Sequence, residues 1–206
     1  MYKNITNYSN IEKYKKIIIL MRHSEAIHNK NVNIAVKNAI KNNKCPKKTK
    51  ENELMKKEYI NAPLSEKGTI NAKKSIKIIQ KFINIDNTIV ISSPLLRSLQ
   101  TAYIFDFKNK RNNIITNNLL IERRTKRPCD NFTMQSIDKN TPEETNEQVF
   151  KRTKKFCKFI NTINDKKYVI IISHKRFFIE LSKNKKYFEN YGNPYFEPGE
   201  LRVFIK

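Results

Sequence analysis

The chain has 206 residues, and its 42 Lys and Arg against 19 Asp and Glu give a formal net charge of +23. This length favours one domain with a substantial core. The positive charge would attract phosphates, nucleic acid or an anionic membrane surface, and charge alone does not choose among them. The sequence has no zinc-ligand spacing, basic zipper or Gly-rich aromatic RNA-binding pattern. Nucleic acid is therefore a less favoured partner.

The cysteines and the apolar runs indicate a reducing compartment. Cys45, Cys129 and Cys157 are odd in number and widely spaced, which argues against a disulfide framework. Residues 1–16 are too polar for a signal-peptide segment, and no apolar run approaches the roughly 20 residues that span a bilayer. We expect a cytoplasmic protein with no membrane partner, in which residues 1–15 are a polar N-terminal extension and residues 16–206 a single domain.

The first predicted elements are a strand over residues 17–21 and a helix from about residue 28 to residue 40. Residues 41–57 follow as a charged stretch with Pro46 at its centre and few apolar side chains. The composition of this stretch predicts a mobile, basic insertion.

A second helix is predicted after Ser65, which can cap it, and a strand over residues 88–92. Pro94 fits the first turn of the next helix. A possible strand covers residues 112–116. The apolar side chains expected on the inner face of the Pro94 helix are Leu95, Leu96, Leu99, Ala102 and Tyr103.

The last elements are a helix capped by Thr141 and running to about residue 163, a strand over residues 168–172, a helix after His174 and a strand over residues 201–205. Strands that alternate with helices predict an α/β fold with a mostly parallel central sheet and helices on both faces.

Polar residues follow three of these strands. Arg22 and His23 come after the first, Ser92 and Ser93 end the second, and His174 follows the strand over residues 168–172. Ligands of such sheets bind at the carboxyl ends of the strands, so these residues are candidates for one site.

The residue types at these strand ends suit phosphoryl transfer. A phosphate monoester needs fixed cations, and the planar guanidinium groups of Arg22 and Arg97 can each bind two oxygens. A neutral histidine such as His23 can attack phosphorus, and neighbouring cations would lower its pKa. Histidines flanked by arginines suit an anion better than a cation, so we expect no metal and no other cofactor.

The reaction also requires an acid beside the leaving oxygen. The spacing leaves four candidates open: Glu25, Glu122, Glu143 and Glu144.

Four segments together resemble the histidine phosphatase superfamily in its phosphoglycerate-mutase-like branch. They are residues 18–25 with His28 and Asn29 after them, residues 62–68, residues 92–102 and residues 171–174. Weaker similarity extends to Glu122, to residues 127–130 and to residues 200–204. The resemblance covers residues 16–206 and implies the three-layer fold of that branch.

The resemblance also implies roles for individual residues. It makes His23 the nucleophile, Arg22, Arg97 and His174 the ligands of the phosphoryl group, and Glu122 the proton donor. Asn29 is implied to help at the edge of the phosphate. In the other branch of the superfamily an acid directly follows the second histidine, whereas here Lys175 and Arg176 stand there.

The chain departs from the family at two positions. Ser24 and Lys175 follow the two histidines, where the family usually has glycine. The Ser24 hydroxyl could add a donor to the phosphate, and Lys175 could either narrow the site or add a phosphate contact.

These observations favour a phosphoric monoester hydrolase that acts through a phosphohistidine on a small phosphorylated metabolite or a phosphopeptide. A phosphoglycerate-mutase-type phosphotransferase and a non-catalytic phosphate-binding protein are the alternatives. The sequence leaves the substrate and the oligomeric state open, and a homodimer is one of the states it allows.

Overall fold

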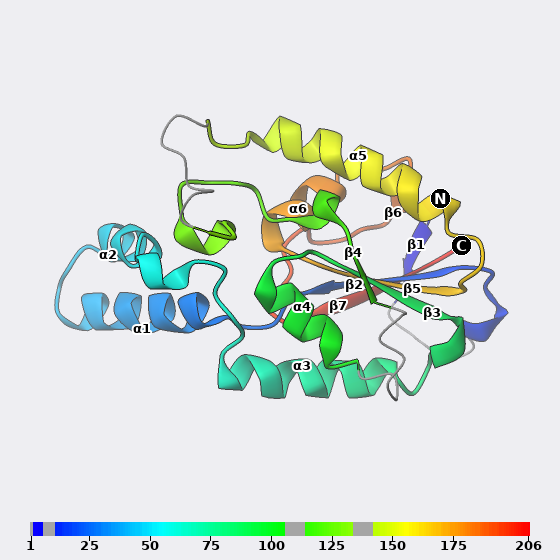
Figure 1. Ribbon diagram of the computed structural model, residues 1–206, viewed down its shortest axis with the longest axis horizontal. Helices are drawn as coiled ribbons and strands as arrows, with labels where there is room; N and C mark the ends of the chain where they lie inside the picture. Colours follow the sequence, from blue (N-terminus) through cyan, green and yellow to red (C-terminus); the bar gives the residue numbers. More distant parts are fainter. Residues whose placement is uncertain (1, 6–10, 106–113, 134–141) are drawn as a thin grey trace.

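The computed structural model describes residues 2–5, 11–105, 114–133 and 142–206. A seven-stranded sheet in the order β4-β3-β5-β2-β7-β1-β6 forms the centre of this part of the chain (Figure 1). The strands are β1 (Tyr2–Ile5), β2 (Ile17–Arg22), β3 (Thr88–Ser92), β4 (Ile114–Thr116), β5 (Tyr168–Ser173), β6 (Phe188–Glu189) and β7 (Leu201–Ile205).

Neighbouring strands are parallel in one part of the sheet, and the rest of the sheet contains both parallel and antiparallel pairs. β2, β5, β3 and β4 are parallel neighbours, with Ile17 opposite Tyr168 and Arg22 opposite Ser173. β7 lies antiparallel to both β2 and β1, and β1 is parallel to β6. The α/β fold predicted from the alternating elements, with its mostly parallel sheet, is confirmed.

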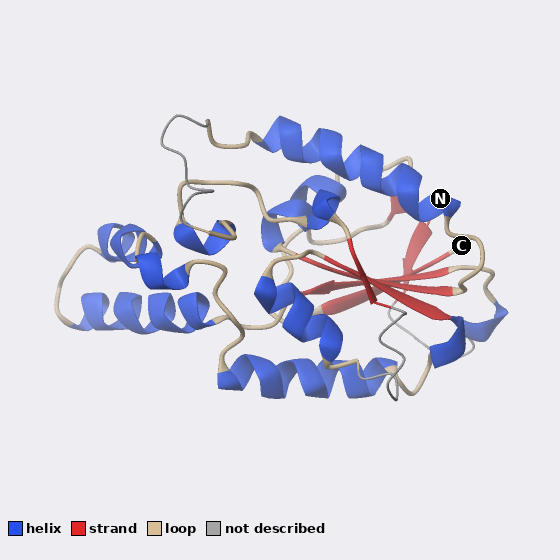
Figure 2. Cartoon of the chain, viewed as in Figure 1, coloured by secondary structure: helices blue, strands red, loops and turns tan. Residues whose placement is uncertain are grey.

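The helices are α1 (Ile27–Lys41), α2 (Pro46–Leu54), α3 (Glu66–Ile79), α4 (Leu96–Tyr103), α5 (Asn146–Thr162) and α6 (Lys175–Leu181). α5 and α6 cover one face of the sheet and α3 and α4 the other, which gives three layers, whereas α1 and α2 project beyond the sheet (Figures 1 and 2).

The strands bury both of their faces, which explains their uninterrupted apolar sequences. In β2, Ile18 and Leu20 pack toward α5 and α6, while Ile17 and Ile19 pack into the cluster that includes α3. Successive side chains of a strand point to opposite faces, so one run of four apolar residues supplies two cores. Among the described residues, no helix is long and apolar enough to cross a membrane.

The N-terminal segment was expected to be a polar extension, but its described residues join the sheet. Residues 2–5 form β1, which pairs with β7 and β6. Ile11 is buried in the core beside α3. Backbone hydrogen bonds to neighbouring strands do not require apolar side chains, which is why the composition of this segment concealed the strand.

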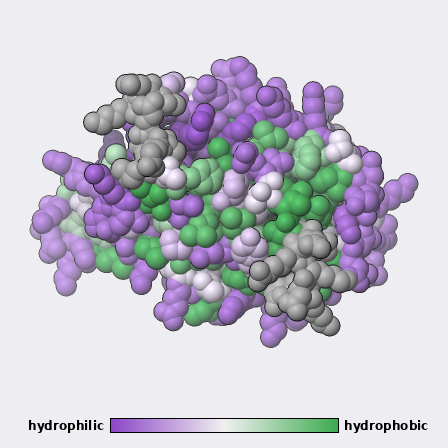
Figure 3. All heavy atoms as spheres, viewed as in Figure 1, coloured by the Kyte–Doolittle hydropathy of each residue, from purple (hydrophilic) through white to green (hydrophobic). Residues whose placement is uncertain are grey.

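The structure has a packed helix in residues 41–57, where the sequence predicted a mobile insertion. Nine of them form α2, which begins with Pro46 at its first position and packs along α1 (Figure 1). Leu54 is buried in a small cluster with Val32, Tyr59 and Cys129. Leu54 and the hydrogen bond from the Tyr59 hydroxyl to Glu53 dock the end of the helix, while most of its other side chains are exposed. Figure 3 shows hydrophilic residues over this end of the molecule.

Two helix starts also differ from the predictions. α5 begins at Asn146 with Thr145 as its cap, in a capping box with Gln148, and the predicted cap Thr141 lies outside the described residues. α4 begins at Leu96, so Pro94 lies just before the helix and not in its first turn.

The inner face of α4 is polar, in contrast to the apolar face predicted. Its buried helical residues are Arg97, Ser98, Thr101 and Ala102, and Tyr103 is exposed. Leu95 is buried as the residue before the helix. A helix that turns polar side chains toward the interior needs partners for them, and α4 finds these partners at the strand ends.

Candidate active site

The carboxyl ends of β2, β3 and β5 meet at a cavity of about 380 Å³. Arg22, His23, Asn29, Arg97 and Glu122, all predicted site residues, line this cavity. The other lining side chains come from α1, α2, the segment over residues 122–130, the start of α6 and residues 197–198. The predicted site residues therefore converge, with one exception in detail: His174 is buried directly beside His23 and is not itself a lining residue.

His23 has a defined orientation. Its Nδ1 lies 2.7 Å from the carbonyl oxygen of Ser24, which can only accept a hydrogen bond. Nδ1 must therefore carry the proton of the neutral ring, and the lone pair is on Nε2. Burial lowers the pKa of His23 well below its usual value, and the charges of Arg97 and Arg22 lower it further. The neighbouring charges were predicted to lower this pKa, and burial is the larger cause.

Arg97 connects His23 to the opposite wall of the cavity. Its Nε–H donates to Nε2 of His23 at 3.2 Å, and its Nη1 donates to the carbonyl oxygen of Cys129 at 2.6 Å. Its Nη2 lies 3.7 Å from a carboxylate oxygen of Asp130. Arg97 is 1% exposed, and burying a guanidinium without partners would cost several kcal/mol. These three partners hold it at the floor of the cavity.

His174 lies at the end of β5, with its ring centroid 4.9 Å from that of His23. Its Nε2 is 2.8 Å from the hydroxyl of Ser93 and 3.3 Å from that of Ser98. Its Nδ1 is buried and has no hydrogen-bond partner among the described residues. Burial and the charge of Arg97 lower the pKa of His174, which favours a neutral ring.

Arg22 and Asn29 complete the inner part of the site. Nη1 of Arg22 donates to the carbonyl oxygen of Phe196 at 2.8 Å, while its Nε is buried without a partner. Asn29 uses its side-chain oxygen to accept from the N–H of Ala26 at 3.1 Å, which caps α1. An anion in the cavity could receive the unused N–H of Arg22.

Glu122 is the one carboxyl group of the four acid candidates that lines the cavity. Its oxygens accept from the N–H of Arg123 at 2.9 Å and, more weakly, from that of Arg176 at 3.4 Å. Burial raises the pKa of Glu122, and the neighbouring Asp130 carboxylate raises it further.

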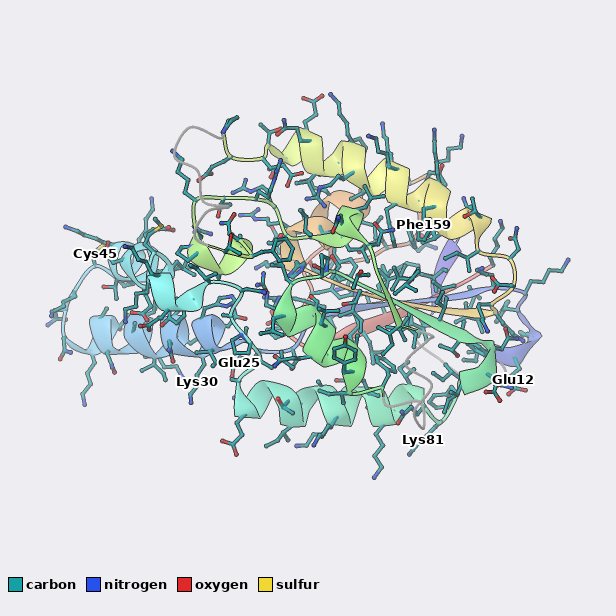
Figure 4. The ribbon with its side chains drawn as sticks, in the orientation of Figure 1. Glu12, Glu25, Lys30, Cys45, Lys81 and Phe159 are labelled. Atoms are coloured by element: carbon teal, nitrogen blue, oxygen red, sulfur yellow. The ribbon has the colours of Figure 1, made fainter. Side chains whose placement is uncertain are left out.

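The other three acid candidates have structural partners. Glu25 accepts from the hydroxyl of Ser65 at 2.7 Å and lies where α1 begins, close to the start of α3 (Figure 4). Glu143 accepts from the N–H of Lys126 at 3.1 Å. Glu144 forms a two-pronged ion pair with Arg152, at 2.7 and 2.8 Å.

Arg152 also fixes the segment that carries Glu122. Its Nη1 donates to the carbonyl oxygens of Leu119 and Ile121 at 2.6 and 3.1 Å. A guanidinium can donate to both oxygens of a carboxylate and to two carbonyls at once, which exceeds the three N–H donors of a lysine. The position of Glu122 therefore depends on α5, which carries Arg152.

Two lining residues had no role in the sequence analysis. His28 is buried on α1, and burial together with the charges of Arg97 and Arg22 lowers its pKa to about 3. Asp130 accepts from the Thr125 hydroxyl at 2.7 Å, and burial raises its pKa although Arg97 opposes this. Both residues lie within segments that resemble the family. What distinguishes them is that they are buried in the cavity, and burial depends on the fold.

The two departures from the family pattern do not strain the backbone. Neither Ser24 nor Lys175 has a positive φ angle. The Ser24 hydroxyl is buried near Gly199 and does not line the cavity, so it is not placed to contact a phosphate there. Lys175 does line the cavity, and its ammonium group lies 5.1 Å from the centre of the Tyr195 ring.

A larger cavity, of about 510 Å³, lies at the opposite ends of the strands. Its lysines serve as partners of backbone carbonyls: Lys16 donates to Ile163 and Lys166 donates to Asp86. It contains no histidine. No group of His, Cys, Asp and Glu in the described part of the chain could hold a metal ion.

Several solved structures share this fold. YhfR of Bacillus stearothermophilus is 17% identical, with a TM-score of 0.62 over 91% of this chain and 90% of that one. A mycobacterial glucosyl-3-phosphoglycerate phosphatase in complex with VO3 is 15% identical, with a TM-score of 0.58 over 91% and 92%. The alpha-ribazole phosphatase of Shigella flexneri is 14% identical, with a TM-score of 0.55 over 81% and 78%. No match was found among curated proteins.

The chain is thus a three-layer α/β protein that gathers histidine and arginine side chains at the carboxyl ends of its strands. Residues 48–181, more than half of the chain, match the model of the histidine phosphatase superfamily (branch 1), and the chain belongs to this family. The matched segment contains Arg97, Glu122 and His174. Arg22, His23 and Asn29 precede it and are connected to it by the geometry described above.

Proposed function

We propose that this protein is a phosphoric monoester hydrolase that forms a phosphohistidine on His23, with a small phosphorylated metabolite or a phosphopeptide as substrate. One observation carries the proposal. The hydrogen bond from Nδ1 of His23 to Ser24 leaves the lone pair on Nε2, beside Arg97 in a cavity lined with cations. A neutral, oriented imidazole is what nucleophilic attack on phosphorus requires.

In the first step, Nε2 of His23 forms a bond to phosphorus while the bond to the leaving oxygen breaks. Arg22 and Arg97 hold the phosphoryl oxygens, with Asn29 at the edge, whereas His174, which does not line the cavity, lies beside the ring of His23 at a centroid distance of 4.9 Å. Fixed cations stabilise the charge that develops on the transferring group. The low pKa of His23 supports this step, because the ring stays neutral near pH 7.

Glu122 supplies the proton that the leaving alkoxide needs. Its raised pKa supports this role, because a larger fraction of the carboxyl group is protonated than in water. In the second step the resulting carboxylate takes a proton from a water molecule that attacks the phosphohistidine. Inorganic phosphate leaves, and both His23 and Glu122 return to their starting states.

Two of the structural neighbours are phosphatases, which favours hydrolysis over phosphotransfer. A mutase would return the phosphoryl group to a substrate hydroxyl, and it is the alternative on the same machinery. The ratio of free phosphate to isomerised product separates the two.

The test compares wild-type protein with His23→Ala on an aryl phosphate. We expect kcat/KM to fall at least about a thousandfold. Lys30→Ala, an exposed change on α1, is the control and should keep full activity (Figure 4). Comparable turnover by His23→Ala would contradict the nucleophile assignment. Phosphate binding without turnover by wild-type protein would identify a non-catalytic phosphate-binding protein.

A further inference from the structure

All three histidines of the chain are buried, and His28 differs from the other two in its hydrogen bonding. His23 bonds to the carbonyl oxygen of Ser24, and His174 bonds to the hydroxyl of Ser93. His28 is 5% exposed, yet neither its Nδ1 nor its Nε2 forms a hydrogen bond within the described part of the chain. A buried polar group without a partner destabilises a fold. The fold alone therefore gives no reason for an imidazole at this position.

The surroundings of His28 form a mostly apolar patch on one wall of the cavity. His28 and Val32 are four residues apart, so they share one face of α1, and both line the cavity. Leu54 of α2 packs with Val32 and lines the cavity beside it. We refer to His28, Val32 and Leu54 as the α1 patch. Nδ1 of His28 is enclosed by protein, which leaves Nε2 as the ring nitrogen that can be reached from the cavity.

His28 offers a hydrogen bond without a charge. Burial lowers its pKa to about 3, and the charges of Arg97 and Arg22 contribute, so the ring is neutral near pH 7. Depending on the tautomer, Nε2 of a neutral imidazole either donates a proton or accepts one. A hydroxyl group can be the partner in both cases, whereas a phosphate or carboxylate oxygen can only accept. The α1 patch therefore suits an alcohol: its carbon atoms fit the apolar side chains, and its hydroxyl group fits Nε2.

We propose that His28 is a specificity-determining residue that binds a free hydroxyl group on the alcohol part of the substrate, so that the substrate is a small phosphomonoester of a polyol. The phosphoryl group lies at Arg22 and Arg97, and the carbon chain of the alcohol extends along Val32 and Leu54. The inference rests on the proposed function for the position of the phosphoryl group only, because the hydrogen bond to the hydroxyl group needs no chemistry.

The experiment measures binding by calorimetry to His23→Ala protein, which lacks the proposed nucleophile. The ligands are propyl phosphate and two hydroxypropyl phosphates, with the hydroxyl group on the second or on the third carbon atom. All three carry the same charge. We expect at least one hydroxypropyl phosphate to bind about tenfold more tightly than propyl phosphate, as one added hydrogen bond to a buried group allows.

Substitutions in the same His23→Ala background locate the preference. His28→Leu, of similar volume, should bring the ratio of affinities close to one. His28→Gln should restore part of the ratio, because its amide can donate and accept near the position of Nε2. Lys30→Ala, exposed on α1 and outside the cavity, should keep the full ratio. Equal affinities for the three ligands, or a preference that survives His28→Leu, would overturn the inference.

Urea unfolding distinguishes this role from a structural one. Because His28 has no hydrogen bond to lose in the empty protein, we expect the unfolding midpoint of the His28→Leu protein to stay within about 0.5 M of its parent at pH 7.5. A much lower midpoint, together with an unchanged ratio of affinities in His28→Gln and in wild-type His28, would make His28 a structural residue and overturn the inference.

Turnover by protein that retains His23 separates the inference from the proposed function. Hydrolysis of all three ligands with equal kcat/KM and equal affinity would leave a phosphatase in which His28 does not recognise a hydroxyl group. A preference in binding that depends on His28, without hydrolysis of any ligand, would support the inference and contradict the hydrolase.

Discussion

Arg97 donates its Nε–H to Nε2 of His23 at 3.2 Å while its Nη1 donates to the carbonyl oxygen of Cys129 at 2.6 Å. One guanidinium therefore joins the loop after β2 to the segment that carries Glu122 and Asp130. A phosphoryl group that enters the cavity would meet a cation already fixed next to the attacking nitrogen. The N–H of Arg97 must leave the lone pair of Nε2 and turn to a phosphoryl oxygen before this nitrogen can attack.

Arg97→Lys keeps the positive charge but removes the planar guanidinium group. It therefore tests whether the separate hydrogen bonds of Arg97 to His23 and Cys129 matter. We expect kcat/KM to fall about a hundredfold on an aryl phosphate, because a lysine cannot serve His23, Cys129 and a phosphate oxygen together. Arg124→Lys, an exposed change in the neighbouring segment, is the control. A value of kcat/KM for Arg97→Lys within about threefold of wild type would show that activity does not depend on the planar guanidinium group.

The sequence predicted the helices and strands whose apolar side chains pack into the core. The strands over residues 88–92 and 201–205 have the predicted bounds, and Ser65 caps α3 by accepting from Gly68 at 2.9 Å. The sequence did not predict β1 or α2, because most residues of these two segments are polar. Pairing with β7 and docking through Leu54 are long-range effects that no local pattern contains.

The convergence of Arg22, His23, Arg97 and Glu122 was predicted from strand ends and motifs, and the structure brings these residues to one cavity. That His28 and Asp130 also line this cavity was not predicted. Their importance comes from burial beside Arg97, and burial depends on how α1 and residues 122–130 fold over the site.

Glu122→Gln tests the proton donor through the leaving group. An alkyl phosphate needs protonation of its leaving oxygen much more than an aryl phosphate, whose phenol leaves readily. We expect kcat/KM to fall about a hundredfold or more for the alkyl ester and clearly less for the aryl ester. Glu143→Gln, outside the cavity, serves as the matched control. An equal loss for both esters would argue that Glu122 does not act on the leaving oxygen.

The buried histidines predict how stability depends on pH. His23, His28 and His174 all have lowered pKa values, so the folded chain excludes protons that the unfolded chain binds below about pH 6.5. The free energy of unfolding should therefore fall as the pH falls, by up to about 1.4 kcal/mol per pH unit for each histidine. Glu122 and Asp130, with raised pKa values, act in the opposite direction once the pH approaches those values.

Urea unfolding of wild-type and His28→Asn protein between about pH 6.5 and pH 5.5 measures this effect. The variant lacks one of the three groups and should show a shallower slope over this range. Because the pKa of His28 is about 3 in the folded chain, its contribution spans the whole window. Identical slopes would mean that the pKa of His28 is the same in the folded and the unfolded chain.

Gly68 allows the start of α3 to lie directly against the loop after His23. A methyl group added there would come within 1.9 Å of the carbonyl oxygen of Glu25, which is backbone and cannot swing away. We expect Gly68→Ala to lower the free energy of unfolding by about 3 kcal/mol. Lys67→Ala, at the adjacent exposed position, should change it by less than about 0.5 kcal/mol. Equal stability of the two variants would show that the helix can move without cost.

The covalent intermediate is the central claim, and trapping it is the most direct test. Wild-type protein is mixed with a phosphorus-labelled aryl phosphate, quenched with denaturant at alkaline pH within the first turnovers, and digested. We predict label on the peptide that contains His23 and none in His23→Ala protein treated in the same way. Release of phosphate without any labelled peptide, or label in the His23→Ala protein, would contradict a phosphohistidine at this position.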